Sequence, residues 1–252
     1  MQDPLFGGTM ATGTVEYAAT IAGVRFASIE ISVAHPSIEK AVLETQDGKR
    51  LKITFHLTDV FALEDAQTIV EGLLPSVVNR LAFHRNVPVG EPYFTGASLP
   101  KDASGSSHRV IADTVLLWDS AVPVLTLGED TRQELAKLLD QPYTHHDLYA
   151  AYRFAGYQSD PITRFMFFYN ILLQLNKDSQ KEVDDFIRRE MPDVTQSPSP
   201  YHAGVMETIY TRLRNEVGHG RAGTTAERTR TEMQDNLPAF QNLVRTAISR
   251  VV

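Results

Sequence analysis

Hydrophobic and polar positions alternate in the first part of the chain, which is the pattern of half-buried β-strands. Residues 13–34 are rich in valine, isoleucine, threonine and aromatic side chains and predict two strands. Residues 41–57 hold two alternating runs on either side of Asp47 and Gly48. Because Asp-Gly readily adopts the positive φ angles of a type I′ turn, this segment predicts a tight β-hairpin. Residues 109–127 predict one or two further strands.

Between these strands the spacing of apolar residues changes to that of an amphipathic helix over residues 59–85. Pro75 falls inside this pattern and is expected to kink or divide the helix. Residues 87–108 contain three prolines and many small polar residues, so they predict a loop.

From residue 129 onward the pattern is helical. The predicted helices cover residues 129–140, 145–156, 161–175, 179–190, 202–217 and 237 to the end. Gly156 is expected to cap the second of them, and Gly218 with Gly220 to end the fifth. Strands followed by helices predict an α+β fold, with one β-rich domain of unknown role over residues 11–128 and a helical domain over residues 129–252, whose core is 160–252.

The composition adds limits on the class of protein. The chain has 252 residues, of which 42 % are hydrophobic, so it can bury a core in one or two domains. The chain contains no run of 18 or more apolar residues, so no transmembrane helix is predicted. The absence of cysteine excludes disulfides, thiolate catalysis and cysteine-based zinc sites, and fits a cytoplasmic location. Residues 1–10 resemble an expression remnant rather than a signal peptide.

The net charge of −7 argues against a surface built throughout for nucleic acid. The charge is uneven, because residues from 160 onward carry 12 acidic and 12 basic side chains. The whole excess of negative charge therefore lies in residues 1–159. From residue 201 onward seven arginines outnumber five acids, so a polyanionic partner would have to bind there.

The candidate chemistry lies in the string TRLRNEVGHG at residues 211–220, which contains Arg214, Asn215 and His219. Arginine offers a fork of charged donors to a phosphate group. Histidine titrates near neutral pH and can accept or donate a proton. Asparagine can orient either group. These side chains suit metal-free cleavage of RNA, in which a 2′-hydroxyl attacks the adjacent phosphate.

The geometry of a helix sets a condition on this interpretation. Five residues turn an ideal helix by about 500°, so Arg214 and His219 point roughly 140° apart. We therefore expect a composite site, made either by a helix that opens at Gly218 or by two copies of the helix that meet in a homodimer.

Arg-Asn-x-x-x-His, preceded by an apolar helix with Tyr210 and followed by glycine, resembles the signature of the HEPN superfamily. The resemblance covers roughly the last 90–110 residues. The layout also resembles larger bacterial HEPN proteins of the methylamine-utilisation type. The resemblance implies a helical bundle, a homodimer, no metal or other cofactor, and often ribonuclease activity in toxin–antitoxin or antiviral systems. It implies an antitoxin or regulatory protein as a further possible partner.

The resulting hypothesis is a homodimeric endoribonuclease with Arg214, Asn215 and His219 at its catalytic site. The arginines expected to hold RNA are Arg188, Arg189, Arg212 and Arg221. For the first three the alternative is a surface ion pair with nearby acids, and for Arg221 it is a place in a linker. One alternative function is a non-catalytic RNA-binding, nucleotide-binding or sensor module, in which the β-rich half recognises a ligand. Another alternative is that the motif only caps a helix.

Two other clusters have simpler interpretations. His145, His146 and Asp147 contain metal-ligating side chains but are more simply the start of a helix. Asp184 and Asp185 could be paired carboxylates, and the simpler expectation is that they lie on the exposed face of their helix.

Overall fold

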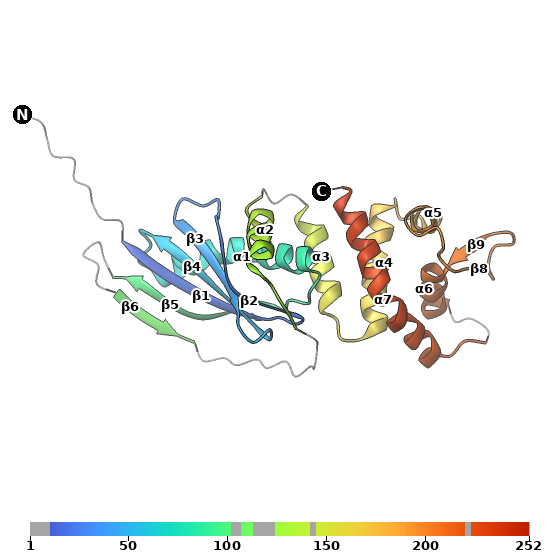
Figure 1. The fold of residues 1–252 in the computed structure, drawn as a ribbon, viewed down its shortest axis with the longest axis horizontal. Coiled ribbons are helices and arrows are strands. Elements are labelled where there is room, and N and C mark those ends of the chain that lie inside the picture. The colour runs from blue at the N-terminus through green and yellow to red at the C-terminus, as the bar shows by residue number, and fades with distance from the viewer. Residues whose placement is uncertain (1–10, 102–106, 113–123, 142–144, 220–222, 252) are drawn as a thin grey trace, which may run out of the picture. The chain divides into compact units, whose positions relative to one another are not determined.

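The computed structural model describes residues 11–101, 107–112, 124–141, 145–219 and 223–251 (Figure 1). The chain divides into two compact units, residues 1–143 and 144–252, which are described separately. The first unit is built on a seven-stranded sheet and the second is largely helical, so the predicted α+β class is confirmed.

The sheet of the N-terminal unit has the strand order β6-β5-β1-β4-β3-β2-β7. Neighbouring strands are antiparallel, except that β7 runs parallel to β2. The strands are β1 (Thr12–Thr20), β2 (Val24–Ile31), β3 (Ile38–Thr45), β4 (Arg50–Thr58), β5 (Tyr93–Pro100), β6 (Ser107–Ile111) and β7 (Leu125–Thr126). The two predicted strands in residues 13–34 are β1 and β2, and the strands predicted at 109–127 are β6 and β7, with 113–123 outside the described residues.

One face of this sheet forms the core with helix α1 (Leu63–Arg85). Alternate strand residues such as Val15 and Ile53 are fully buried against apolar residues of α1, including Val70 and Leu74. Helix α1 is continuous through Pro75, so the predicted division of the helix is wrong. The opposite face of the sheet carries polar residues that are only partly buried.

Helix α2 (Glu129–Asp140) belongs to the N-terminal unit, although the sequence groups it with the helices that follow. Its apolar residues Leu135 and Leu139 are buried in the core of the sheet and α1. The boundary between the units therefore lies at residues 143 and 144 rather than after residue 128.

Two local predictions for this unit are wrong. The expected loop at 87–108 contains β5 and the start of β6, which form a hairpin in which Pro100 pairs with Ser107. Prolines are tolerated there because they lie near strand ends. The hairpin predicted at residues 41–57 is confirmed by the antiparallel pair β3 and β4, and only its turn type is wrong. Within the turn only Gly48 has a positive φ, and the Asp47 carboxylate accepts hydrogen bonds from the backbone of the following residues.

The C-terminal unit consists of five helices and a short hairpin within the described residues. The elements are α3 (His146–Tyr157), α4 (Pro161–Leu175), α5 (Gln180–Glu190), β8 (Gln196–Pro198), β9 (Met206–Thr208), α6 (Ile209–His219) and α7 (Ala226–Ser249). Helix starts agree with the sequence where a capping side chain is present, as at Asp160 for α4 and Ser179 for α5. The centre of the unit is a stack of aromatic rings from Phe165, Tyr210 and Phe240.

Three helix boundaries differ from the prediction. The helix expected at 202–217 is α6, which begins at Ile209, because residues 206–208 pair with β8 instead. Helix α7 begins at Ala226, about eleven residues earlier than its apolar pattern suggests. Gly156 lies inside α3 rather than capping it.

No helix in the described part of the chain is both long and apolar enough to cross a membrane.

Candidate functional site

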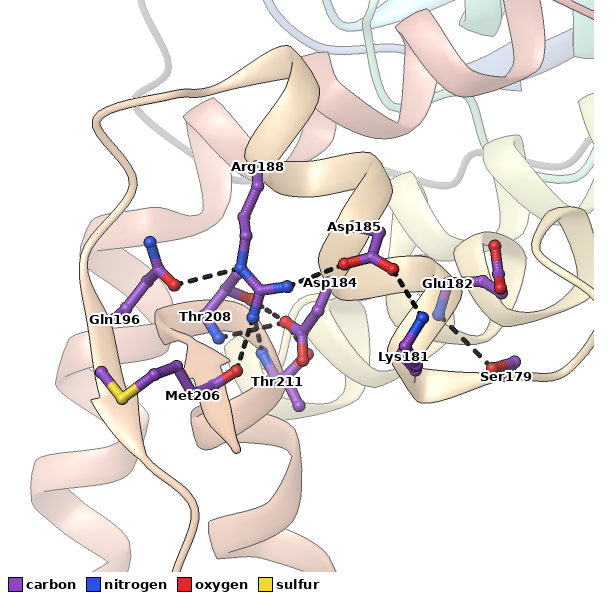
Figure 2. A network of polar contacts seen from close by, with 10 residues as sticks. All are labelled: Ser179, Lys181, Glu182, Asp184, Asp185, Arg188, Gln196, Met206, Thr208 and Thr211. Carbon is purple, nitrogen blue, oxygen red and sulfur yellow. Dashed lines mark hydrogen bonds and ion pairs between the residues drawn. The ribbon is translucent and has the colours of Figure 1, made fainter. Parts of the chain in front are cut away.

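A buried carboxylate positions the start of α6, the helix that carries the candidate motif. Figure 2 shows Asp184 of α5 pointing toward Thr208 and Thr211. Its Oδ1 atom accepts hydrogen bonds from the backbone N–H of Thr208 at 3.0 Å, the Thr208 hydroxyl at 2.6 Å and the Thr211 hydroxyl at 2.8 Å. Asp184 is only 3 % exposed, so the expectation of an exposed carboxylate pair with Asp185 is wrong for Asp184. Asp185 does lie on the exposed face, where it pairs with Lys181 and Arg188.

The same network continues from α6 to α4. The Thr211 hydroxyl uses its proton on Asp184, so in its contact with Tyr169 at 2.9 Å the tyrosine hydroxyl is the donor. Burial raises the pKa of Tyr169, which keeps this hydroxyl protonated. The guanidinium carbon of Arg214 lies 5.8 Å from the centre of the Tyr169 ring, within the range of a cation–π contact. The buried hydrogen bonds among Asp184, Thr211 and Tyr169 therefore fix the position of the ring that Arg214 contacts.

Replacing Asp184 by alanine is expected to destabilise the C-terminal unit by about 3 kcal/mol, because three buried donors lose their acceptor. Asp184→Asn retains an acceptor oxygen and should cost less. Hydrogen exchange of the α6 amides during urea titration measures the change. Asp185→Ala is the matched control on the same helix, with an expected effect below about 1 kcal/mol. Equal destabilisation by the alanine variants at 184 and 185 would contradict the role given to Asp184.

A second chain of hydrogen bonds holds the two polar residues of the motif. Arg214 donates to Oδ1 of Asn215 at 2.9 Å, and Nδ2 of Asn215 donates to Glu207 at 3.2 Å. Glu207 is buried and also accepts a hydrogen bond from the Ser199 hydroxyl at 2.7 Å. Since the amide both accepts from Arg214 and donates to Glu207, its orientation is determined. Asn215 is the link between a buried carboxylate and the arginine.

His219 lies in the last turn of α6 and is exposed. The ring of Tyr201 meets it edge-on, with 5.8 Å between the ring centres.

Arg214, Asn215 and His219 line one pocket of about 240 Å³. Its other lining residues are Gln180, Tyr201, His202 and Glu207. Arg214 and His219 of one chain therefore line the same pocket, although helical geometry points them in different directions. A composite site shared by two chains stays a prediction. Helix α6 does not open at Gly218, which is helical. The segment before β9 instead closes the space beside the helix.

The arginines predicted to bind RNA are mostly engaged within the protein. Arg212 forms ion pairs with Glu216 and Glu232 and has a side chain only 15 % exposed. Burial would lower the pKa of Arg212, but its hydrogen bonds to Glu232 and Glu216 outweigh this and raise it. Arg212 is thus a partly buried cation that holds α6 to α7, and it does not line the pocket.

Arg188 also has an internal role. It donates to Asp185, to the side chain of Gln196 and to the backbone carbonyl of Met206, so it fastens the β8–β9 hairpin to α5 (Figure 2). Arg189 is exposed and lies over the ring of Phe186. Neither lines the pocket, and Arg221 lies outside the described residues.

The sequence interpretation missed four pocket residues, namely Gln180, Tyr201, His202 and Glu207. Residues 202–208 follow two prolines and are expected to begin a helix, in which their side chains would face different directions. The closeness of Tyr201 and His202 to the motif in sequence was a signal, since a turn before α6 can fold back on that helix. No comparable signal exists for Gln180.

No group of three or more histidine, aspartate or glutamate side chains in the described residues is arranged to hold a metal ion. This includes the cluster at His145, His146 and Asp147, which begins α3.

Comparison with known proteins concerns this C-terminal unit. No curated protein and no solved structure matches the chain. The model of the family described as methylamine utilization protein MauJ matches residues 148–251, a range that contains every residue lining the pocket. The C-terminal unit is therefore similar to the methylamine utilization protein MauJ family, the type that the layout of the sequence resembles.

Proposed function

We propose that the C-terminal unit is an endoribonuclease of the HEPN type that needs no metal ion. The observation that carries the proposal is the pocket in which Arg214, Asn215 and His219 meet within one chain. Such a pocket brings together a permanent positive charge and an imidazole that can accept or donate a proton, which are the two requirements of metal-free phosphodiester cleavage.

The proposed reaction is the transfer of the phosphate from the 5′-oxygen to the 2′-oxygen. The 2′-oxygen of a ribose attacks the adjacent phosphorus and gives its proton to an imidazole, while the bond from phosphorus to the 5′-oxygen breaks. The departing 5′-oxygen takes a proton from a second group. The products are a 2′,3′-cyclic phosphate and a 5′-hydroxyl. Arg214 stabilises the negative charge that develops on the phosphate, and the hydrogen bond from Arg214 to Asn215 holds the guanidinium in place.

The second proton-transfer group in this proposal is His202, which lines the same pocket as His219. Two imidazoles allow one to act as general base while the other acts as general acid. The exposed aromatic ring of Tyr201, next to His219, offers a surface on which a base of the RNA can stack.

His202→Ala is expected to lower cleavage and to remove one limb of a bell-shaped pH profile, because a single imidazole then remains. The measurement is the initial rate of cleavage of a fluorescent RNA across pH 5 to 9. Tyr201→Phe serves as the control, since it keeps the ring but is not expected to change the profile. A two-limbed profile in His202→Ala, with apparent pKa values equal to those of the wild type, would remove His202 from the mechanism.

The test of the function itself is incubation of the protein with RNA in EDTA, followed by analysis of the product ends. Cyclic phosphate and 5′-hydroxyl ends that depend on His219 support the proposal. Cleavage that requires an added divalent ion, or that persists equally without His219, would overturn it.

The homodimer is also a proposal, supported by the resemblance of the motif to HEPN proteins. A dimer would extend the surface for RNA around two pockets, and an antitoxin or regulatory protein would act by covering them. Because each chain supplies both an arginine and a histidine to its own pocket, we propose that the dimer supports two sites rather than one composite site.

The second candidate function is a non-catalytic sensor in which the N-terminal unit recognises a ligand. A basic hollow on its sheet favours this candidate. The two candidates differ in one result, since the sensor binds its ligand without cleaving RNA.

A further inference from the structure

The polar face of the N-terminal sheet contains a hollow of about 420 Å³. It lies over strands β4, β1, β5 and β6, on the face opposite α1, where Thr14 and Glu16 are partly exposed while Val15 and Tyr17 are buried. A volume of this size is typical of sites for small-molecule ligands.

The shape of the hollow has a local cause in β5. Glu16 pairs with Gly96 and Tyr17 with Phe94, so Thr95 is an extra residue that forms a bulge. The carbonyl oxygen of Thr95 accepts a hydrogen bond from Ala112 instead of joining the ladder with β1. A Cβ atom at position 96 would lie 2.9 Å from the carbonyl oxygen of Val110, so only glycine fits there. The floor of the hollow is therefore open backbone and small side chains.

The walls of the hollow are positively charged. Arg50, Lys52 and Arg109 line it, against one carboxylate, Glu16, which pairs with Lys52 at 3.1 Å. Within the residues that the structure describes, the side chains of Arg50 and Arg109 take part in no ion pair, and both residues are exposed. Two arginines thus face the hollow without a negative partner.

This concentration of cations stands out against the charge of its own unit. Residues 1–143 contain 18 acidic and 11 basic side chains, a net charge of −7. A long polyanion would extend beyond the hollow over this acidic surface and be repelled. A small anion is attracted mainly by the cations next to it, because salt largely screens charges that are farther away than about 10 Å.

The spacing of the two free arginines indicates more than one anionic group. Arg109 is on β6 and Arg50 on β4, three strands apart, which corresponds to about 14 Å across the sheet. The register places Arg109 level with Thr14 and Arg50 level with Thr20, so their backbones also lie about 20 Å apart along the strands. Each guanidinium can bind a phosphate through two parallel hydrogen bonds. Hydroxyl groups of Thr14, Thr95 and Ser98 lie between them and can bind the uncharged part of a ligand.

We propose that this hollow binds a small ligand of nucleotide size that carries at least two phosphate groups. The site lies in the N-terminal unit and goes beyond the proposed cleavage of RNA, which involves residues of the C-terminal unit. It gives the β-rich half of the chain a ligand-binding role.

Calorimetric titration of the full chain with ATP, with inorganic pyrophosphate and with adenosine tests the proposal. The wild type should bind ATP and pyrophosphate, and adenosine much more weakly. Arg50→Ala with Arg109→Ala should weaken ATP binding by about tenfold or more, because two charge-assisted contacts are lost. Lys40→Ala with Lys137→Ala removes the same charge from the same unit outside the hollow, and should bind ATP within about twofold of the wild type.

Three results would overturn the proposal. The first is no binding of ATP or pyrophosphate by the wild type at concentrations on the order of millimolar. The second is equal weakening by the two double variants, which would indicate a general charge effect. The third is that a short single-stranded RNA binds more tightly than ATP, and that this binding depends on Arg50 and Arg109. The ligand of the hollow would then be nucleic acid rather than a small molecule. Circular dichroism checks that the variants remain folded, as expected for exposed residues.

Discussion

His219→Ala is expected to lower the rate of RNA cleavage in EDTA by about 100-fold or more, the usual contribution of a positioned acid or base. The imidazole is exposed in the pocket, so its loss should not disturb packing. Arg214→Ala is expected to have an effect of similar size, since it removes the charge that stabilises the developing phosphate anion. Initial rates with a fluorescent RNA, together with circular dichroism of each variant, provide the measurement.

His56→Ala is the matched control, because this histidine lies on β4 in the N-terminal unit. Its cleavage rate should equal that of the wild type. If His219→Ala and Arg214→Ala cleave RNA at the same rate as His56→Ala, a contaminating nuclease is responsible and the proposed site is wrong.

Mixing the inactive Arg214→Ala and His219→Ala proteins distinguishes a site within one chain from a site shared by two. A composite site in a symmetric dimer would restore about a quarter of the wild-type activity, because half of the dimers would hold one intact site. We expect no recovery, since Arg214 and His219 of the same chain line the same pocket. Recovery of cleavage activity would instead support the composite site that the helical geometry of the motif predicts.

Arg212→Ala is expected to destabilise the C-terminal unit by about 3–5 kcal/mol, because it leaves a buried carboxylate without its cation. The side chain of Glu216 is only 2 % exposed, and its remaining described partner is the Thr229 hydroxyl at 2.9 Å. Urea unfolding followed by hydrogen exchange of α6 and α7 measures the loss.

Arg228→Ala is the control for this prediction. Arg228 also pairs with Glu232, but its side chain is 63 % exposed, so the expected change is below about 1 kcal/mol. Combining Arg212→Met with Glu216→Gln removes both charges and should recover much of the lost stability. No recovery in the double variant would show that Arg212 acts through packing of its aliphatic chain rather than through its charge.

The same cluster predicts how stability changes with pH. Burial would raise the pKa of Glu232, but hydrogen bonds from Arg212 and Arg228 outweigh burial and lower it. A carboxyl group whose pKa is lowered by folding stabilises the folded state above its ordinary pKa. This contribution is lost as the pH falls through the lowered value, so the wild type should lose more stability in acid than Arg212→Ala.

Several features were predictable because they depend on neighbours along the chain. The 3.6-residue spacing of apolar positions located α1, α2 and α4, and Asp160 followed by Pro161 indicated the start of α4. The order of strands followed by helices was enough to predict the α+β class. The motif was recognisable because Arg214, Asn215 and His219 belong to a single helix.

Strand β5 shows where such reasoning fails. Gly96, Pro100 and the preceding Pro92 indicate a loop, but pairing with β1 on one side and β6 on the other makes this segment a strand inside the sheet. Asp184 is a second example, since the sequence predicts an exposed carboxylate. It is buried because the hydroxyl groups that satisfy it come from residues 24 and 27 positions later in the chain.

The sequence by itself therefore determined the class of fold, most helices and the identity of the motif, all of which follow from local spacing and capping. The tertiary structure alone decided that Arg214 and His219 share a pocket, that Arg212 is a structural cation, and that His202 and Tyr201 join the site. It also placed Arg50 and Arg109 around one hollow. The physical reason is that these arrangements depend on which distant segments pack together, and periodicity along one segment carries no information about its partners.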